Sequence, residues 1–285
     1  MNNPFKLIEC PRDAMQGWKN FIPTDKKIEY INSLLKVGFD TIDFGSFVSA
    51  KAIPQMADTK EVVGNLDLGI SNTRLLAIVA NLRGAEEASV YDQITYLGFP
   101  FSVSETFQQR NTNSSIEESL KRIEEIQNLC INKNRKLVIY ISMAFGNPYG
   151  DIYDEDIVFN WVEKLVELDI EIISLADTVG VASPEQVYDM TSYLVESLPS
   201  TEIGVHLHST FENWQPKLGA AIKAGAKRFD GALKGIGGCP MANDDLVGNM
   251  NTEWMISYFE KNNIATGLNK EALAESLRLA EEIFI

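Results

Sequence analysis

The chain has 285 residues, about 45% of them hydrophobic, and a formal net charge of −15 at pH 7. This length can bury a large core, and it suits one (β/α) barrel of roughly 250 residues. The acidic charge disfavours nucleic acid as a partner, because both molecules would repel each other. The sequence contains no apolar run of about 18 residues, so we expect no membrane span.

The N-terminal residues lack the basic start and the apolar stretch of a secretory signal. The three cysteines, Cys10, Cys130 and Cys239, are too few and too scattered for a disulfide framework. Free cysteines are typical of a reducing compartment, so we expect a cytoplasmic protein.

Short runs rich in isoleucine and valine alternate with longer amphipathic stretches along the chain. Such runs are typical of parallel strands that are buried on both faces. The expected strands are Lys6–Cys10, Thr41–Phe44, Leu75–Val79, Gln93–Leu97, Lys136–Ser142, Ile170–Leu175, Ile203–His208 and Arg228–Ala232.

Helical patterns lie between these strands. Ile116–Ile131 begins with the capping-box pair Ser115 and Glu118, and Ser183 followed by proline begins another helix. A further amphipathic helix is expected over Asn269–Ile285. The pattern predicts an α/β fold, a single (β/α)8 TIM barrel over residues 1–285 with an extra C-terminal helix. A doubly wound open sheet is the alternative, but no G-x-G-x-x-G motif follows the first strand.

The sequence contains only two histidines, His206 and His208. Residues two apart in a strand point to the same face, so both imidazoles could bind one metal ion. The alternative is a pair of polar residues on a solvated edge strand. Ile203, Val205 and Leu207 would face the other way, as wall residues do, which favours an interior metal site.

Catalytic residues of a barrel come from the carboxyl ends of its strands. Arg12 and Asp13 follow the first strand, where they would form either a cation beside an oxygen ligand or a surface ion pair. Asp43 lies in an apolar stretch, where a carboxylate needs a partner. Asp177 follows the sixth strand, as either a support of the site or a loop cap.

A glycine-rich segment over residues 235–240 follows the eighth strand and contains Cys239. A structural cysteine is normally buried in apolar packing, so a cysteine on such a mobile loop is more often reactive. Asn249 offers an amide oxygen near the same mouth of the barrel.

Nine motifs occur together in an order and spacing that resemble those of the 3-hydroxy-3-methylglutaryl-CoA lyases, which are TIM-barrel enzymes related to the Claisen condensing enzymes. The resemblance extends from about Ile8 to about Lys270. The motifs are Pro11–Gln16, Ser46–Ser49, Pro54–Asp58, Ser104–Phe107, Asn113–Leu120, Ser174–Thr178, His206–His208, Gly237–Pro240 and Gly248–Asn249.

The resemblance implies metal-dependent cleavage of 3-hydroxy-3-methylglutaryl-CoA to acetyl-CoA and acetoacetate, as in leucine degradation, with Mg²⁺ or Mn²⁺ as cofactor. It implies that the metal ligands are Asp13, His206, His208 and Asn249. It gives Arg12 the role of stabilising an enolate oxygen and Cys239 that of protonating the carbanion. It also places Asp177 near the metal, and Gln16 and Tyr140 near the substrate.

The catalytic base stays open at this point. The candidates are Asp13, Asp43, Asp177 and His206. An anionic acyl-CoA also needs local cations on so acidic a chain. The candidates for this contact, each at an expected strand end or βα loop, are Arg83, Arg110 and Lys234. A homodimer or a higher homo-oligomer is expected.

This chain departs from the family pattern at four places, one of which is the loop between Cys239 and Asn249, about one residue longer and more acidic than in the family. Asp43 stands where the family has glutamate, Ser209 where it has aspartate, and Val138 where it has arginine, two residues before Tyr140. These departures leave the acyl-group specificity and a binding role open, and a synthase of the same superfamily is a further alternative. The chain could cleave a longer branched 3-hydroxyglutaryl-CoA, could be a Claisen condensing synthase, or could be a barrel that retains the metal for a binding role.

Overall fold

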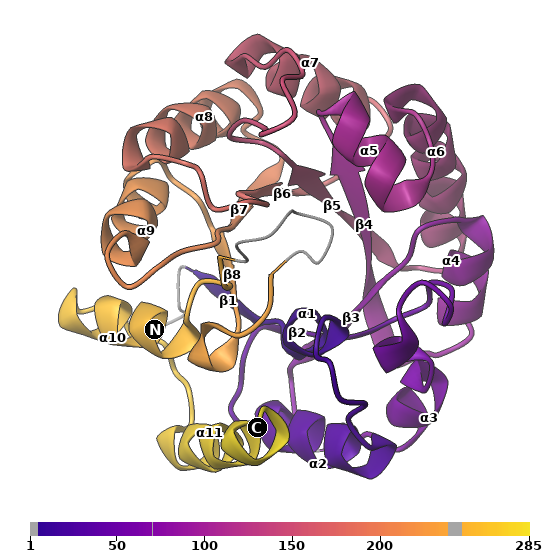
Figure 1. The fold of residues 1–285 in the computed structure, drawn as a ribbon, viewed down its shortest axis with the longest axis vertical. Helices are drawn as coiled ribbons and strands as arrows, with labels where there is room; N and C mark the ends of the chain where they lie inside the picture. The colour runs from indigo at the N-terminus through magenta and orange to yellow at the C-terminus, as the bar shows by residue number, and fades with distance from the viewer. Residues whose placement is uncertain (1–4, 70, 239–246) are drawn as a thin grey trace.

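The computed structural model describes residues 5–69, 71–238 and 247–285. Figure 1 shows parallel strands around a closed central barrel, with helices outside them. The strands follow each other round the barrel in chain order, which confirms the predicted TIM barrel. Their bounds are β1 Lys6–Glu9, β2 Thr41–Ser46, β3 Arg74–Ile78, β4 Ile94–Ser102, β5 Lys136–Ser142, β6 Ile172–Ala176, β7 Glu202–His206 and β8 Arg228–Gly231.

Most helices cover the outside of the barrel, whereas the short α1 lies over its mouth (Figure 1). Their bounds are α1 Pro11–Gln16, α2 Thr24–Leu35, α3 Thr59–Gly64, α4 Leu82–Ala88, α5 Glu105–Thr112, α6 Ile116–Asn132, α7 Glu155–Val166, α8 Pro184–Ser197, α9 Trp214–Lys223, α10 Thr252–Lys261 and α11 Lys270–Ile283, with short 3-10 turns η1 Pro54–Met56 and η2 Leu233–Gly235. The predicted C-terminal helix is α11, which packs beside α2 in Figure 1. None of the helices described is long and apolar enough to cross a membrane.

Side chains that alternate along the strands divide the interior into two regions. Ile203, Val205 and Leu207 point outward into the large apolar core between sheet and helices, as predicted. A smaller apolar cluster inside the barrel includes Leu76, Tyr96 and Val138. The remaining interior positions toward the carboxyl ends of the strands are therefore free for polar side chains.

Only β5 has its predicted bounds at both ends; most other strand ends shift by one or two residues, and the ends of β4 and β7 bear most on the site. β4 was expected to end at Leu97 but continues to Ser102, because it pairs with β5 in register along its length, including Pro100 with Tyr140. β7 ends at His206 rather than His208. His208 instead forms an isolated antiparallel bridge with Asn249, and this bridge places Asn249 at the barrel mouth.

The helix starts agree with the sequence prediction. Both expected caps form complete capping boxes, Ser115 with Glu118 at α6 and Ser183 with Gln186 at α8. In each box, the serine oxygen and the carboxylate or amide oxygen accept hydrogen bonds from backbone N–H groups that a helix start leaves unpaired.

A buried carboxylate joins β1 to the segment that follows β8. Glu9 is fully buried and accepts hydrogen bonds from the Leu233 amide at 2.8 Å and the Thr252 hydroxyl at 2.6 Å. Burial raises the pKa of Glu9 from 4.5 to about 8, although both hydrogen bonds oppose the rise. The folded protein therefore holds a proton here that the unfolded chain releases near pH 4.5.

This proton predicts a pH-dependent stability. Between pH 4.5 and about 8 the folded state binds more protons than the unfolded state at Glu9, so the free energy of unfolding falls as the pH rises through this window. We expect Glu9→Gln to reduce this fall by on the order of a few kcal/mol. Urea unfolding at several pH values measures the slope, with Glu117→Gln on the exposed face of α6 as control. Equal slopes in wild type and Glu9→Gln would contradict the assignment.

Candidate metal centre and active site

Three predicted metal ligands meet at the carboxyl end of the barrel. Asp13 comes from α1, His206 from the end of β7, and His208 from the bridge just beyond it. One ligand atom of each lies within 4.8 Å of the others, and the two imidazole centroids are 5.4 Å apart. The arrangement is a possible metal-binding site.

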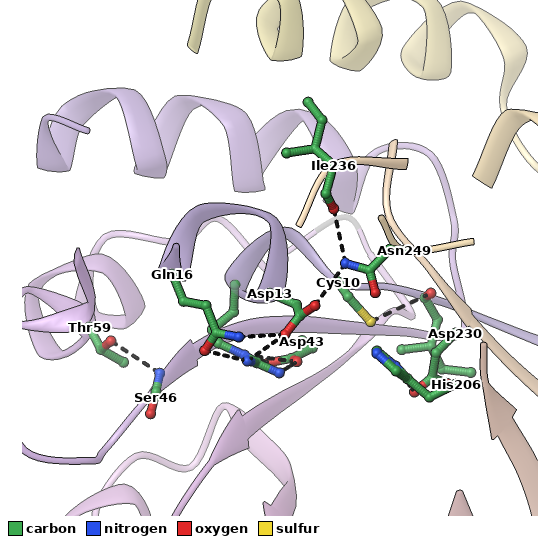
Figure 2. Close-up of polar contacts among 12 residues, drawn as sticks. Cys10, Asp13, Gln16, Asp43, Ser46, Thr59, His206, Asp230, Ile236 and Asn249 are labelled. Carbon is green, nitrogen blue, oxygen red and sulfur yellow. Dashed lines mark hydrogen bonds and ion pairs between the residues drawn. The ribbon is translucent and has the colours of Figure 1, made fainter. Parts of the chain in front are cut away.

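Asn249 lies beside this group of side chains, and Figure 2 shows its contact with Asp13. Its Nδ2 donates hydrogen bonds to Asp13 Oδ2 at 2.7 Å and to the Ile236 carbonyl at 2.9 Å. Its Oδ1 is buried and has no hydrogen-bond partner among the described residues. Buried polar atoms are normally paired, so this free oxygen fits the role of a metal ligand.

Gly237 allows this close packing. A Cβ atom at this position would lie 2.6 Å from Asn249 Nδ2 and 2.9 Å from the Asp13 carbonyl oxygen. The backbone φ of Gly237 is also +104°, which side chains of L residues rarely tolerate. A glycine is therefore required where the segment after β8 passes over the ligands.

The pKa values of the two histidines shift in opposite directions, because Asp230 lies beside only one of them. Burial, with a smaller effect of His206, lowers the pKa of His208 to about 3, so its imidazole is neutral at pH 7. Burial also opposes charge on His206, but the hydrogen bond and charge of Asp230 raise the His206 pKa overall. His206 Nδ1 lies 3.3 Å from Asp230 Oδ2.

Asp13 is held as a carboxylate. Burial would raise its pKa, but the charge of Arg12 and the nearby histidines lower it overall. Because a metal binds neutral imidazole and ionised carboxylate, the neutral His208 and the ionised Asp13 suit a cation site.

Arg12 stands at the centre of a polar network on the opposite side of Asp13. Its Nε and Nη2 donate to Asp43 Oδ2 at 3.0 and 2.5 Å. Its Nη1 donates to Asp13 Oδ1 and to Gln16 Oε1, both at 2.9 Å. Burial raises the pKa of Asp43, against the lowering effect of Arg12. Asp43 is thus the partner that fixes the guanidinium, with both oxygens turned toward Arg12.

Asp177 lies behind the ligands rather than among them. Its Oδ2 accepts a hydrogen bond from Lys217 Nζ at 2.7 Å, and Lys217 also donates to the His208 carbonyl at 3.0 Å. Asp177 and Lys217 therefore support the backbone of His208. Tyr140 lies on the other side, with its ring edge-on to His206 at a centroid distance of 5.8 Å.

The three cations considered for coenzyme A lie outside this centre. Arg83 is largely exposed and pairs with Glu87, and Lys234 pairs with Glu281. Arg110 lies over the ring of Tyr149 at 4.6 Å. Cys239 lies outside the described residues.

The sequence interpretation missed several residues that surround the centre. Asp230 and Arg228 lie two apart in β8 on its inner face, and a charged pair within a buried strand was a signal that could have found them. Lys217 in α9 gave no such signal. Cys10 lies close enough to His206 and Asp230 to form a second possible ligand group. Burial and nearby carboxylates raise the pKa of Cys10, so it stays a protonated thiol and a poor ligand.

Known proteins share both this sequence and this fold. The cytoplasmic 3-hydroxy-3-methylglutaryl-CoA lyase of Rattus norvegicus is 34% identical over 272 residues, covering 95% of this chain and 78% of the relative. The hydroxymethylglutaryl-CoA lyase of Bacillus subtilis is 33% identical over 275 residues, covering 95% of this chain and 90% of the relative.

A solved HMG-CoA lyase from Acinetobacter baumannii, in complex with coenzyme A and 3-methylmalate, superposes with a TM-score of 0.92 at 32% identity. The alignment covers 100% of this chain and 92% of the other. The HMGL-like family profile matches residues 6–279. The chain therefore belongs to the HMGL-like family, which confirms the resemblance to 3-hydroxy-3-methylglutaryl-CoA lyases predicted from its motifs.

Proposed function

We propose that this protein is a divalent-metal-dependent carbon–carbon lyase that cleaves 3-hydroxy-3-methylglutaryl-CoA to acetyl-CoA and acetoacetate. The observation that carries the proposal is the free Asn249 Oδ1 beside Asp13 and the two histidines at the barrel mouth. Membership of the HMGL-like family and relatives named for this reaction support the substrate.

Asp13, His206, His208 and Asn249 would hold Mg²⁺ or Mn²⁺. Two nitrogen and two oxygen donors without a thiolate favour these ions over structural zinc. When bound, such an ion acts as a Lewis acid that lowers the pKa of a coordinated alcohol and stabilises the alkoxide.

The reaction is a retro-Claisen cleavage. A base takes the proton of the C3 hydroxyl, the C2–C3 electron pair moves onto the thioester as an enolate, and C2 is then protonated. Arg12, held at the mouth by Asp43, would stabilise the enolate oxygen. A preorganised donor of this kind is worth about 3–4 kcal/mol in the transition state.

The contacts narrow the choice of base. Asp43 is engaged by Arg12, and Asp177 by Lys217. We therefore place the proton acceptor at the ligand cluster, on Asp13 or His206. Cys239 would deliver the proton to C2, and Gln16 and Tyr140 would line the acyl site.

The coenzyme A part of the substrate would contact cations at the rim. Arg83, Arg110 and Lys234 stay candidates for this contact. Assembly into a homodimer or a higher homo-oligomer, and a cytoplasmic location, stay predictions.

Steady-state kinetics after chelation and metal add-back test the proposal. We expect acetoacetate from 3-hydroxy-3-methylglutaryl-CoA only with Mg²⁺ or Mn²⁺ present, and faster than from longer branched analogues.

We also expect Cys239→Ala to lower kcat by orders of magnitude while Mn²⁺ still binds. Release of free CoA from acetyl-CoA and a 2-oxo acid, without lyase activity, would instead identify a condensing enzyme. Metal binding without either reaction would support a binding role.

A further inference from the structure

An arginine lies buried inside the barrel below the metal centre. Arg228 of β8 is fully buried, and none of its guanidinium nitrogens has a hydrogen-bond partner among the described residues. The strand register places it level with Tyr140, Ser174 and Gly204 on β5, β6 and β7. The Tyr140 hydroxyl and Ser174 Oγ also lack described partners. A charged group in such a place needs a compensating role.

The nearest anion to this guanidinium is Asp230, two residues along the same strand. Arg228 Nε lies 3.6 Å from Asp230 Oδ1, and the Arg228 guanidinium lies over the Tyr96 ring at 5.6 Å. Gly204 leaves the space for this side chain, because a Cβ there would lie 2.7 Å from Arg228 Cβ. The absence of a side chain at Gly204 therefore makes room for Arg228 on the neighbouring strand.

Asp230 links the arginine to the metal centre. Its other oxygen, Oδ2, faces His206 Nδ1 at 3.3 Å, and Figure 2 shows the two side chains together. A metal-binding histidine commonly donates its second ring N–H to a carboxylate, which fixes both its tautomer and its orientation. Asp230 would thereby leave His206 Nε2 free for the metal.

The arginine shares the barrel interior with apolar side chains of neighbouring strands. Val138 lies in one interior cluster with Tyr96 and Tyr140. The interior guanidinium comes from β8, on the strand that also carries Asp230.

We propose that Arg228 is a positioning residue of the metal centre: it holds the Asp230 carboxylate, which in turn holds His206 with Nδ1 protonated and Nε2 directed to the metal. Because Arg228 is fully buried, it acts through Asp230 and does not contact substrate. The inference rests on the proposed ligand role of His206.

The first test measures Mn²⁺ affinity of the full chain by electron paramagnetic resonance, so that it does not depend on lyase activity. We expect Arg228→Met to weaken Mn²⁺ binding about tenfold to a hundredfold, as loss of outer-shell partners does. The matched control is Arg135→Met, which removes a part-buried arginine paired with Asp92 on the other end of the fold and should leave the affinity unchanged.

Two further variants keep the test decisive if Arg228→Met does not fold. Arg228→Lys keeps the charge but loses the planar fork, and it should weaken Mn²⁺ binding severalfold. The double variant Arg228→Met/Asp230→Asn removes both buried charges, and it should bind Mn²⁺ no more weakly than Asp230→Asn alone, since the arginine acts through the aspartate.

The second test observes the histidines directly. The chain has only two, so long-range proton–nitrogen spectra of the Mg²⁺-saturated protein contain two imidazole patterns. We expect one Nδ1-protonated pattern for His206 in wild type and a mixture of tautomers in Arg228→Lys.

The outcomes separate this inference from the proposed function. A folded Arg228→Met or Arg228→Lys protein with Mn²⁺ affinity within twofold of wild type and an unchanged His206 pattern overturns the positioning role alone. A wild-type protein that binds no Mn²⁺ overturns the proposed metal centre and the positioning role with it.

Discussion

Replacement of Arg12 by glutamine is expected to lower kcat by about two to three orders of magnitude while Mn²⁺ affinity stays within a few-fold of wild type. The guanidinium contributes no metal ligand, but it is the one cation that contacts both Asp13 and Asp43 among the described residues. The positive charge of Arg12 would stabilise the enolate oxygen, so the substitution would raise the free energy of the transition state. Steady-state kinetics and a Mn²⁺ titration measure the two effects separately.

Arg12→Gln alone also leaves Asp43 buried without its cation. Removing one partner of a buried ion pair costs about 3–5 kcal/mol of stability, so part of any lost activity could come from unfolding. The double variant Arg12→Gln/Asp43→Asn removes the stranded charge, and we expect it to recover stability but not kcat. Recovery of kcat together with stability would show that Arg12 has a structural role only.

Asn249→Ala is expected to weaken Mn²⁺ binding by about a hundredfold or more. The change removes the free Oδ1, and it also removes the Nδ2 that orients Asp13 Oδ2 at 2.7 Å. Loss of an outer-shell partner alone costs tenfold to a hundredfold, and a direct ligand contributes more. Electron paramagnetic resonance of free Mn²⁺ measures the change.

The chain supplies a matched control two residues away. Asn251 is also buried, but its side chain accepts a hydrogen bond from the Trp254 amide at 2.9 Å and caps α10. Asn251→Ala should therefore cost about 1 kcal/mol of stability and leave Mn²⁺ affinity unchanged. Equal Mn²⁺ affinities in Asn249→Ala and Asn251→Ala would exclude Asn249 as a ligand.

Much of the fold could be predicted because buried parallel strands are short apolar runs between amphipathic helices. The end of β4 could not, because Gly98 and Pro100 are poor strand formers and only the pairing with β5 extends the strand past them. The predicted end of β7 at His208 was also wrong. His208 pairs instead with Asn249 in an isolated bridge, which joins residues far apart in the sequence. The strand propensity of a local segment does not predict such long-range pairings.

The ligands of the site could be predicted from local sequence, but not all of the residues that support them. His206 and His208 were recognisable from their spacing, and Asp13 from its place after a strand. Asp177 was recognisable as a possible support of the site, but its partner Lys217 was not, because Lys217 reaches Asp177 and the His208 carbonyl from a helix that shows no unusual pattern. A buried lysine in a helix looks like any surface lysine until the packing of that helix is known.

The close approach of Gly204 to Arg228 has a consequence for the history of the barrel. A side chain at position 204 and an arginine at position 228 cannot occupy the same space, since Cβ would lie 2.7 Å from Cβ. In homologous chains with the same strand spacing, a Cβ atom should therefore occur at only one of the two positions, so that a side chain at 204 is accompanied by glycine at 228. Such paired substitutions would mark the lineages that lack the interior arginine on β8.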